Sequence, residues 1–207
     1  MTKILKHQFF FGVIFSIMAT AVFADHKEKE YEYVQYLWLL DGLKNTYECD
    51  VPETEIGSTI ANCHDHKVID LKTNKIIGIA TDATTDVETV GDGLVATGTT
   101  FFHLPEGNLV IRGRGTIQPM LEGEPKLNGA PVTHIAGIFP EDGENNVIDG
   151  TGVFRNATGT FGLLGALDLT NAAEGQAQFN CVYFLNLRLE KNVDCKPKNK
   201  RNRRSKK

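Results

Sequence analysis

The chain has 207 residues, with 22 basic and 26 acidic side chains. After the N-terminal region, no stretch has the roughly 20 successive apolar residues that a membrane span needs, which excludes a protein built from many membrane helices. The charges are unevenly distributed, because nine basic residues and one acid fall within residues 191–207. An acidic body therefore ends in a basic tail.

The N-terminus has the three-part pattern of a secretory signal peptide. Lys3 and Lys6 form a positive region, residues 9–21 are mostly apolar, and Val22-Phe23-Ala24 suits a signal peptidase. The alternative is a retained membrane anchor, for which the apolar stretch is short. We predict that residues 1–24 are a signal peptide and that the mature protein is secreted or periplasmic, with a length that suits one domain.

Four cysteines, Cys49, Cys63, Cys181 and Cys195, follow the predicted cleavage site. An even number in an oxidising compartment indicates disulfides, and four cysteines allow three pairings. Proximity favours Cys49–Cys63 and Cys181–Cys195. The alternative, zinc ligation, lacks the usual Cys-x-x-Cys spacing.

In chain order, residues 25–32 are charged, and residues 33–40 are rich in β-forming side chains, although a helix is an alternative there. Residues 41–66 have mixed polarity and contain two of the cysteines. We predict a long loop pinned by a disulfide, so that residues 25–66 add an N-terminal strand and a loop to the domain.

From residue 67 onward, short runs of β-formers alternate with turn signals, which predicts hairpins. The last run alternates most clearly, with Tyr183 and Leu185 on one face and Asn186 and Arg188 on the other. A period of two indicates a strand with one buried face. The predicted strands are residues 68–71, 76–80, 94–104, 109–119, 132–139, 147–149, 159–169 and 175–189.

This succession of strands without a long amphipathic helix predicts an all-β sandwich or barrel over residues 67–190. Glycines two residues apart, such as Gly113 and Gly115, are typical of places where a sheet bends or backbones approach closely. A closed barrel also leaves no free edge. We therefore predict a barrel.

The segment Ile-Asp-Gly-Thr-Gly-Val-Phe-Arg-Asn-Ala-Thr-Gly, residues 148–159, resembles the glycine-rich signature of dirigent proteins and the related segment of allene oxide cyclases. The likeness extends over residues 68–189. It implies an eight-stranded antiparallel β-barrel of the calycin type, often trimeric in plant members. Two positions depart from the dirigent pattern: Thr158 replaces an arginine and Val153 replaces an acid. The dirigent acid–arginine pair is therefore not carried over, and no residue matches the allene oxide cyclase glutamate.

The residue types of the same segment also predict a structural corner. Gly150, Gly152 and Gly159 permit positive φ or close packing. Phe154 suits a core position, and Arg155 is expected to pair with an acid or a carbonyl group.

Two further features are the histidines and the C-terminal tail. His64 and His66 would share a face if they lay on a strand, as two ligands of a metal site would. His103 and His134 could complete such a site only through folding. We therefore expect exposed loop histidines and predict neither a metal nor a cofactor. The polar and basic composition of residues 196–207 predicts a disordered tail that contacts anionic surfaces. The tail lacks the interleaved aromatic residues of single-strand binders, which argues against sequence-specific nucleic-acid binding.

Together these observations predict a secreted barrel that binds an apolar small molecule and guides its cyclisation or coupling, as an isomerase or cyclase would. The alternative is a non-catalytic structural or interaction module of the cell envelope that uses its basic tail. No catalytic residue is assigned, and a cavity of several hundred Å³ would favour the ligand hypothesis. The predicted pocket residues are Thr99, Phe101, Ile111, Phe161, Tyr183 and Leu185.

Overall fold

The structure, a computed structural model, describes residues 29–43, 45–120, 125–127, 129–140 and 143–191. The predicted signal peptide and residues 192–207 of the basic tail lie outside these ranges. No helix in the described ranges is long and apolar enough to cross a membrane.

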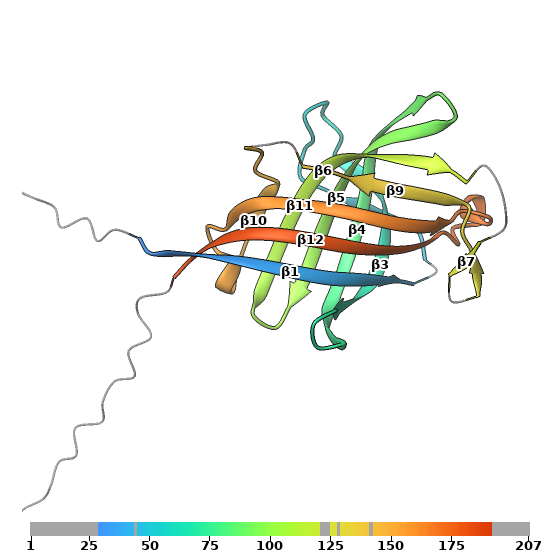
Figure 1. The fold of residues 1–207 in the computed structure, drawn as a ribbon. Coiled ribbons are helices and arrows are strands. Elements are labelled where there is room, and N and C mark those ends of the chain that lie inside the picture. Colours follow the sequence, from blue (N-terminus) through green and yellow to red (C-terminus); the bar gives the residue numbers. More distant parts are fainter. Residues whose placement is uncertain (1–28, 44, 121–124, 128, 141–142, 192–207) are drawn as a thin grey trace, which may run out of the picture.

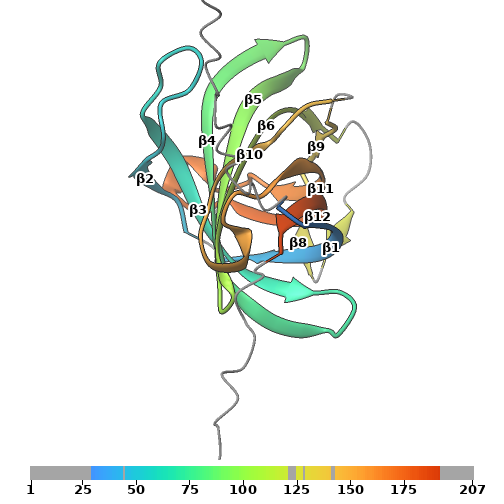
Figure 2. The ribbon, with the colours of Figure 1, turned by 90° about the vertical axis from the view of Figure 1, so that its left-hand side faces the viewer.

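Eight antiparallel strands of the described residues form a closed ring (Figures 1 and 2). Their order around the ring is β1, β12, β11, β9, β6, β5, β4 and β3, and β3 pairs again with β1. This confirms the prediction of an eight-stranded antiparallel barrel. The strands are β1 (Tyr31–Gly42), β3 (Ile60–Asp70), β4 (Lys75–Val90), β5 (Gly93–Leu104), β6 (Gly107–Pro119), β9 (His134–Ile138), β11 (Thr158–Asp168) and β12 (Gln178–Glu190).

Four shorter strands and two 3₁₀ turns complete the fold. The first short strand, β2 (Tyr47–Asp50), pairs with the first four residues of β3, and β10 (Val147–Gly150) pairs with β6. A separate small hairpin consists of β7 (Lys126–Leu127) and β8 (Ala130–Pro131). The 3₁₀ turns are η1 (Gly152–Phe154) and η2 (Ala172–Glu174).

The barrel is flattened, with two groups of strands that cross each other (Figure 1). In that view β1, β12, β11 and β9 run across the front, while β3, β4, β5 and β6 run steeply behind them. The start of β1 lies beside the end of β12, because Tyr31 pairs with Glu190. Both ends of the described chain therefore leave the barrel on the same side.

Alternation on β12 shows how the core forms. Cys181, Tyr183, Leu185, Leu187 and Leu189 are all buried and belong to one apolar cluster, whereas the residues between them face outward. Burying an aliphatic or aromatic side chain stabilises a fold by roughly 1.5–3 kcal/mol, so this face alone contributes substantially.

The prediction of a long loop over residues 41–66 is wrong in part. This segment contains β2 and the first seven residues of β3, and the real loop between them is residues 51–59. The strand was missed because its inward-facing positions include His64 and His66, which hide the apolar alternation. Residues 33–40 lie in β1, which excludes the helical alternative.

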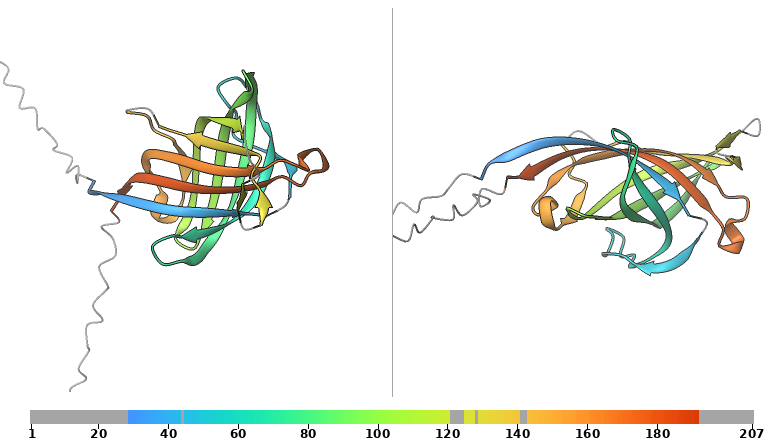
Figure 3. Two further views of the ribbon diagram at one scale, coloured as in Figure 1. Left: turned by 45° about the vertical axis from the view of Figure 1, so that its right-hand side comes forward. Right: turned by 90° about the horizontal axis from the view of Figure 1, so that it is seen from below.

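A second, smaller core lies outside the barrel wall. Val51, Ala61, Cys63 and Ala83 pack together there, because β2 and the loop that follows it cover the outer face of β3 and β4. Figure 3 shows this cyan segment standing off the green strands. The disulfide Cys49–Cys63 joins β2 to β3 with a Cα–Cα distance of 6.0 Å, which confirms this predicted pairing.

Candidate functional site

Four polar side chains from four strands meet inside the otherwise apolar barrel. His66 on β3, Asp82 on β4 and Thr100 on β5 occupy inward positions of neighbouring strands, and Tyr183 reaches them from β12 on the facing wall. Phe102 and Phe161 pack against the Tyr183 ring, with centroids 5.6 and 5.8 Å away. The aromatic neighbours hold the phenol in place with its hydroxyl directed at Asp82. We call these four residues the inner polar cluster.

One carboxyl group organises the cluster. The hydroxyl of Tyr183 donates to Asp82 Oδ1 at 2.9 Å, and the hydroxyl of Thr100 donates to the same oxygen at 2.6 Å. The other oxygen, Oδ2, lies 3.2 Å from Nε2 of His66. The Thr100 and Tyr183 hydroxyls are themselves 2.9 Å apart.

Burial determines the electrostatics of this cluster. Burial raises the pKa of Tyr183 well above its usual value, and the neighbouring Asp82 charge raises it further, so the phenol stays protonated and acts as a donor. The His66 side chain is fully buried. Neither Nδ1 nor Nε2 has a hydrogen-bond partner among the described residues, although Nε2 lies 3.2 Å from Asp82 Oδ2. A buried polar atom without a partner costs about 1–3 kcal/mol, so an otherwise well-ordered site retains an unsatisfied group here.

A cavity of about 70 Å³ lies next to the cluster. Its polar lining residues are Asp82, Tyr183, His64, Thr84 and Thr116. Most of its wall is apolar, formed by residues that include Ala96, Ala136, Leu163, Leu167 and Phe179. Convergent polar groups in an apolar cavity are typical of ligand sites, but such sites usually measure about 300–1,000 Å³.

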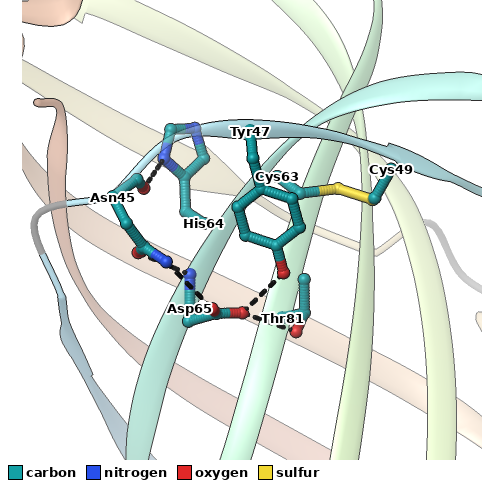
Figure 4. The surroundings of a disulfide bond; sticks show 7 residues. All are labelled: Asn45, Tyr47, Cys49, Cys63, His64, Asp65 and Thr81. Carbon is teal, nitrogen blue, oxygen red and sulfur yellow. Dashed lines mark hydrogen bonds between the residues drawn. A yellow bond between two sulfur atoms is a disulfide. The ribbon is translucent and has the colours of Figure 1, made fainter. Parts of the chain in front are cut away.

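His64 lies at the rim of this cavity rather than in an exposed loop. Its ring packs against Phe179 at a centroid distance of 4.2 Å with the two rings tilted by 45°. Its Nδ1 lies 3.2 Å from the carbonyl oxygen of Asn45 (Figure 4). Burial lowers the pKa of His64 below its ordinary value. The expectation of exposed loop histidines was therefore wrong for His64 and His66, because both point inward from β3.

Asp65, between the two histidines, points to the outside. It accepts hydrogen bonds from Asn45, Tyr47 and Thr81 (Figure 4). Burial alone would raise the pKa of Asp65, but these three hydrogen bonds lower it overall. The barrel wall thus separates two carboxyl groups, Asp65 outside and Asp82 inside.

The structure divides the six predicted pocket residues into two groups. Ile111, Phe161, Tyr183 and Leu185 belong to the interior core, but of these only Tyr183 lines the cavity. Thr99 and Phe101 do not face the interior, because the even-numbered residues of β5 point inward. Thr99 instead accepts a hydrogen bond from Arg112 Nε on the outer face.

Sequence reasoning missed His66, Asp82 and Thr100 as site residues. The available signal was a polar residue at an inward position of a strand, such as Asp82 two residues after the buried Ala80. The signal could be recognised only once the inward face of each strand was known.

The glycine-rich segment forms a corner at the other end of the barrel. Phe154 is buried in the core, as predicted, and Gly152 has φ of +60°. A side chain at Gly152 would overlap the carbonyl oxygen of Glu106, which explains the glycine. Gly150 and Gly159 likewise pack against backbone, while Arg155 is exposed.

The remaining histidines and cysteines lie elsewhere. His103 on β5 is exposed and His134 begins β9 beside Thr133. No group of three or more metal-ligating side chains occurs within the described ranges.

Cys181 is a buried thiol that lines the cavity, and burial raises its pKa well above the usual value. Its predicted partner Cys195 lies outside the described residues. From Cys181 to the end of β12 the strand extends about 30 Å, whereas the five residues from Glu190 to Cys195 reach at most about 18 Å. We therefore expect Cys181 to remain a thiol.

No family model and no curated protein matches this chain. A solved structure does: a pterocarpan synthase dirigent protein, with 16% sequence identity over 87% of this chain and all of the other, at a TM-score of 0.39. The chain is similar to a dirigent protein. The closed ring of eight antiparallel strands rests on this chain's own strand pairings. At this identity and TM-score, neither fold nor activity is taken from the likeness.

Proposed function

We propose that this protein binds a small, largely apolar molecule at the inner polar cluster and holds it in one orientation. The observation that carries the proposal is the convergence of Asp82, Thr100, Tyr183 and His66 beside an apolar cavity. Placing a carboxyl group inside an apolar barrel is costly unless it is well paired. Such an arrangement is enriched at binding and catalytic sites.

The chemistry of the cluster suggests the polar part of the ligand. Asp82 offers a hydrogen-bond acceptor, and the protonated Tyr183 offers a hydroxyl group. A ligand with an N–H or O–H group can donate to Asp82 while its apolar body contacts Leu163, Leu167 and Phe179. Hydrogen bonds to a charged group contribute about 1.5–3 kcal/mol, enough to select one orientation.

Guiding cyclisation or coupling is the catalytic extension of this proposal. Holding a reactive molecule in a near-reactive geometry removes translational and rotational freedom before the reaction, which by itself can lower a barrier by several kcal/mol. We also propose that the protein acts outside the cytoplasm, which the signal-peptide pattern and the Cys49–Cys63 disulfide support.

The test uses the purified full chain and the fluorescent probe N-phenyl-1-naphthylamine, which is apolar and carries one N–H group. We expect binding to the wild-type protein and a loss of affinity of about 10-fold or more in Asp82→Asn, because the charged acceptor is removed. The matched control is Asp65→Asn, which changes the carboxyl group outside the wall. Mass spectrometry of protein from its native host looks in parallel for a co-purifying apolar molecule.

Two outcomes would contradict the proposal. One is an equal effect of Asp82→Asn and Asp65→Asn on probe affinity. The other is the absence of probe binding together with the absence of any co-purifying molecule.

A further inference from the structure

The interior cavity is too small for the body of most ligands, but a larger space lies directly outside the same wall. A groove of about 560 Å³ lies over the outer side of β5 and β6, between the loop after β2 and the segment after β9. This volume falls within the range of about 300–1,000 Å³ that is typical of ligand sites. Its lining includes Gly113, Arg114, Ile138, Phe139, Asn145 and Asn146.

The cavity and the groove meet at one side chain, Ile138 at the end of β9, which lines both. Ile138 lies over a floor of three inward-facing glycines. A Cβ atom at Gly98 would lie 3.5 Å from Ile138 Cδ1, one at Gly113 would lie 3.0 Å from its Cγ2, and one at Gly115 would overlap its Cγ1. The absence of side chains at these positions leaves the room that Ile138 occupies.

The barrel wall is incomplete at this place. β6 pairs with β10 over Leu109–Ile111 and with β9 over Thr116–Pro119, and in the described chain no strand pairs with Gly113–Gly115 on that side. Beyond Ile138 the chain leaves the sheet. As a result, Gly113 and Ile138, which face inward, also line a groove that is otherwise outside the barrel.

Asn146 bridges part of this gap in the barrel wall. Its side chain donates to the carbonyl oxygen of Arg112 at 3.1 Å and accepts from the amide of Phe161 at 3.2 Å. It therefore links β6 to β11 where no strand lies between them. Beside the three glycines, the side chain of Ile138 separates the groove from the cavity.

We propose that Ile138 is a gate between the groove and the cavity, and that the ligand is an elongated, mostly apolar molecule bound across it. The inference rests on the proposed ligand-binding function. One end of the molecule reaches Asp82 and Tyr183, and its body replaces Ile138 over the glycine floor. The outer end lies in the groove beside Phe139, which is 72% exposed, and the polar groups of Arg114 and Asn145.

The opening requires little rearrangement. Ile138 is only partly buried, it is the last residue of its strand, and the glycine floor offers no side chain to interlock with it. Rotation of one side chain about χ1 moves it from one staggered position to another. The gate can therefore open without breaking a pairing of the barrel.

The experiment uses Cys181, which lines the cavity and reports on access to it without any ligand. In a Cys195→Ser background, the rate of alkylation of Cys181 by N-ethylmaleimide is followed by peptide mass spectrometry. A closed gate whose open state is populated at about 0.1–10% limits this rate, so Ile138→Ala is expected to raise it about 10-fold or more. Ile138→Val, which preserves the packing, should give an intermediate rate, and Ile138→Phe should lower it.

The matched control is Ile135→Ala, which removes the same atoms from an exposed position of the same strand that lines neither space. It is expected to leave the rate unchanged. A second comparison, Phe179→Ala, opens the rim of the cavity at the end of the barrel. Equal rates for Ile138→Ala and Ile135→Ala, or acceleration by Phe179→Ala alone, would overturn the gate.

These experiments distinguish failure of the proposed ligand binding from failure of the Ile138 gate. If Ile138→Ala accelerates alkylation but N-phenyl-1-naphthylamine does not bind the wild-type protein and no apolar molecule co-purifies with it, the gate stands and the proposed function is wrong. If the probe binds and depends on Asp82 but Ile138 variants alkylate at the wild-type rate, the function stands and the gate is refuted.

Discussion

Replacing Tyr183 with phenylalanine tests whether the inner polar cluster is as tightly coupled as its geometry indicates. The change removes one hydroxyl group and leaves the ring packed between Phe102 and Phe161. The hydroxyl donates to Asp82 Oδ1 at 2.9 Å and lies 2.9 Å from the Thr100 hydroxyl. Without it, the Asp82 oxygen keeps only one of its two hydroxyl donors.

The expected cost follows from burial. Tyr183 is 1% exposed and the Asp82 side chain is 16% exposed, so water cannot easily replace the lost donor. A hydrogen bond to a charged group contributes about 1.5–3 kcal/mol. The free energy of unfolding should fall by this amount, which corresponds to a decrease in Tm of roughly 3–12 °C for a domain of this size.

Tyr47→Phe provides the matched control, because Tyr47 donates to Asp65 Oδ1 at 2.8 Å on the outside of the barrel. Tyr47 is 42% exposed, so the same chemical change should cost no more than about 0.5 kcal/mol. Urea unfolding followed by tryptophan fluorescence measures both, since Trp38 is the single tryptophan and packs on Phe102 within the core. Equal costs for the two variants would refute the coupling of Tyr183 to Asp82.

Three further predictions concern stability. Burial lowers the His64 pKa below 6.5, so the unfolded chain binds this proton more tightly than the folded protein does. The free energy of unfolding should therefore fall as pH decreases below about 6.5. Urea titrations at pH 7.5 and 5 should show that His64→Phe removes part of this pH dependence. Replacing both Cys49 and Cys63 with serine should cost about 3 kcal/mol in the same assay, since the bridge spans a sequence separation of 14; no loss would contradict the loop-closure estimate. Gly152→Ala should lower Tm more than Gly143→Ala, because both residues have positive φ but only a side chain at Gly152 would meet backbone. Positive φ by itself costs a residue with a side chain about 1–2 kcal/mol. Equal decreases in Tm for the two variants would argue against the clash at Gly152.

Much of the fold could be predicted from the sequence, because strand formation depends on local alternation. The hairpin of β5 and β6 and the long β12 were expected close to their observed bounds. Most of β3 was expected to be a loop, because its inward-facing residues include the polar His64 and His66. The pairing of Cys49 with Cys63 followed from proximity along the chain, and the structure contains it.

Alternation along β5 determines that Thr99 and Phe101 share one face and that Thr100 lies on the other, but it carries no information about which face looks inward. Only closure of the ring makes that choice, because it places each strand between two neighbours that must bury the same side. The inner polar cluster joins residues up to 117 positions apart, from His66 to Tyr183. The proposed Ile138 gate depends on where β9 leaves β6. Local sequence patterns act over a few residues, whereas these contacts exist only after the whole sheet has closed.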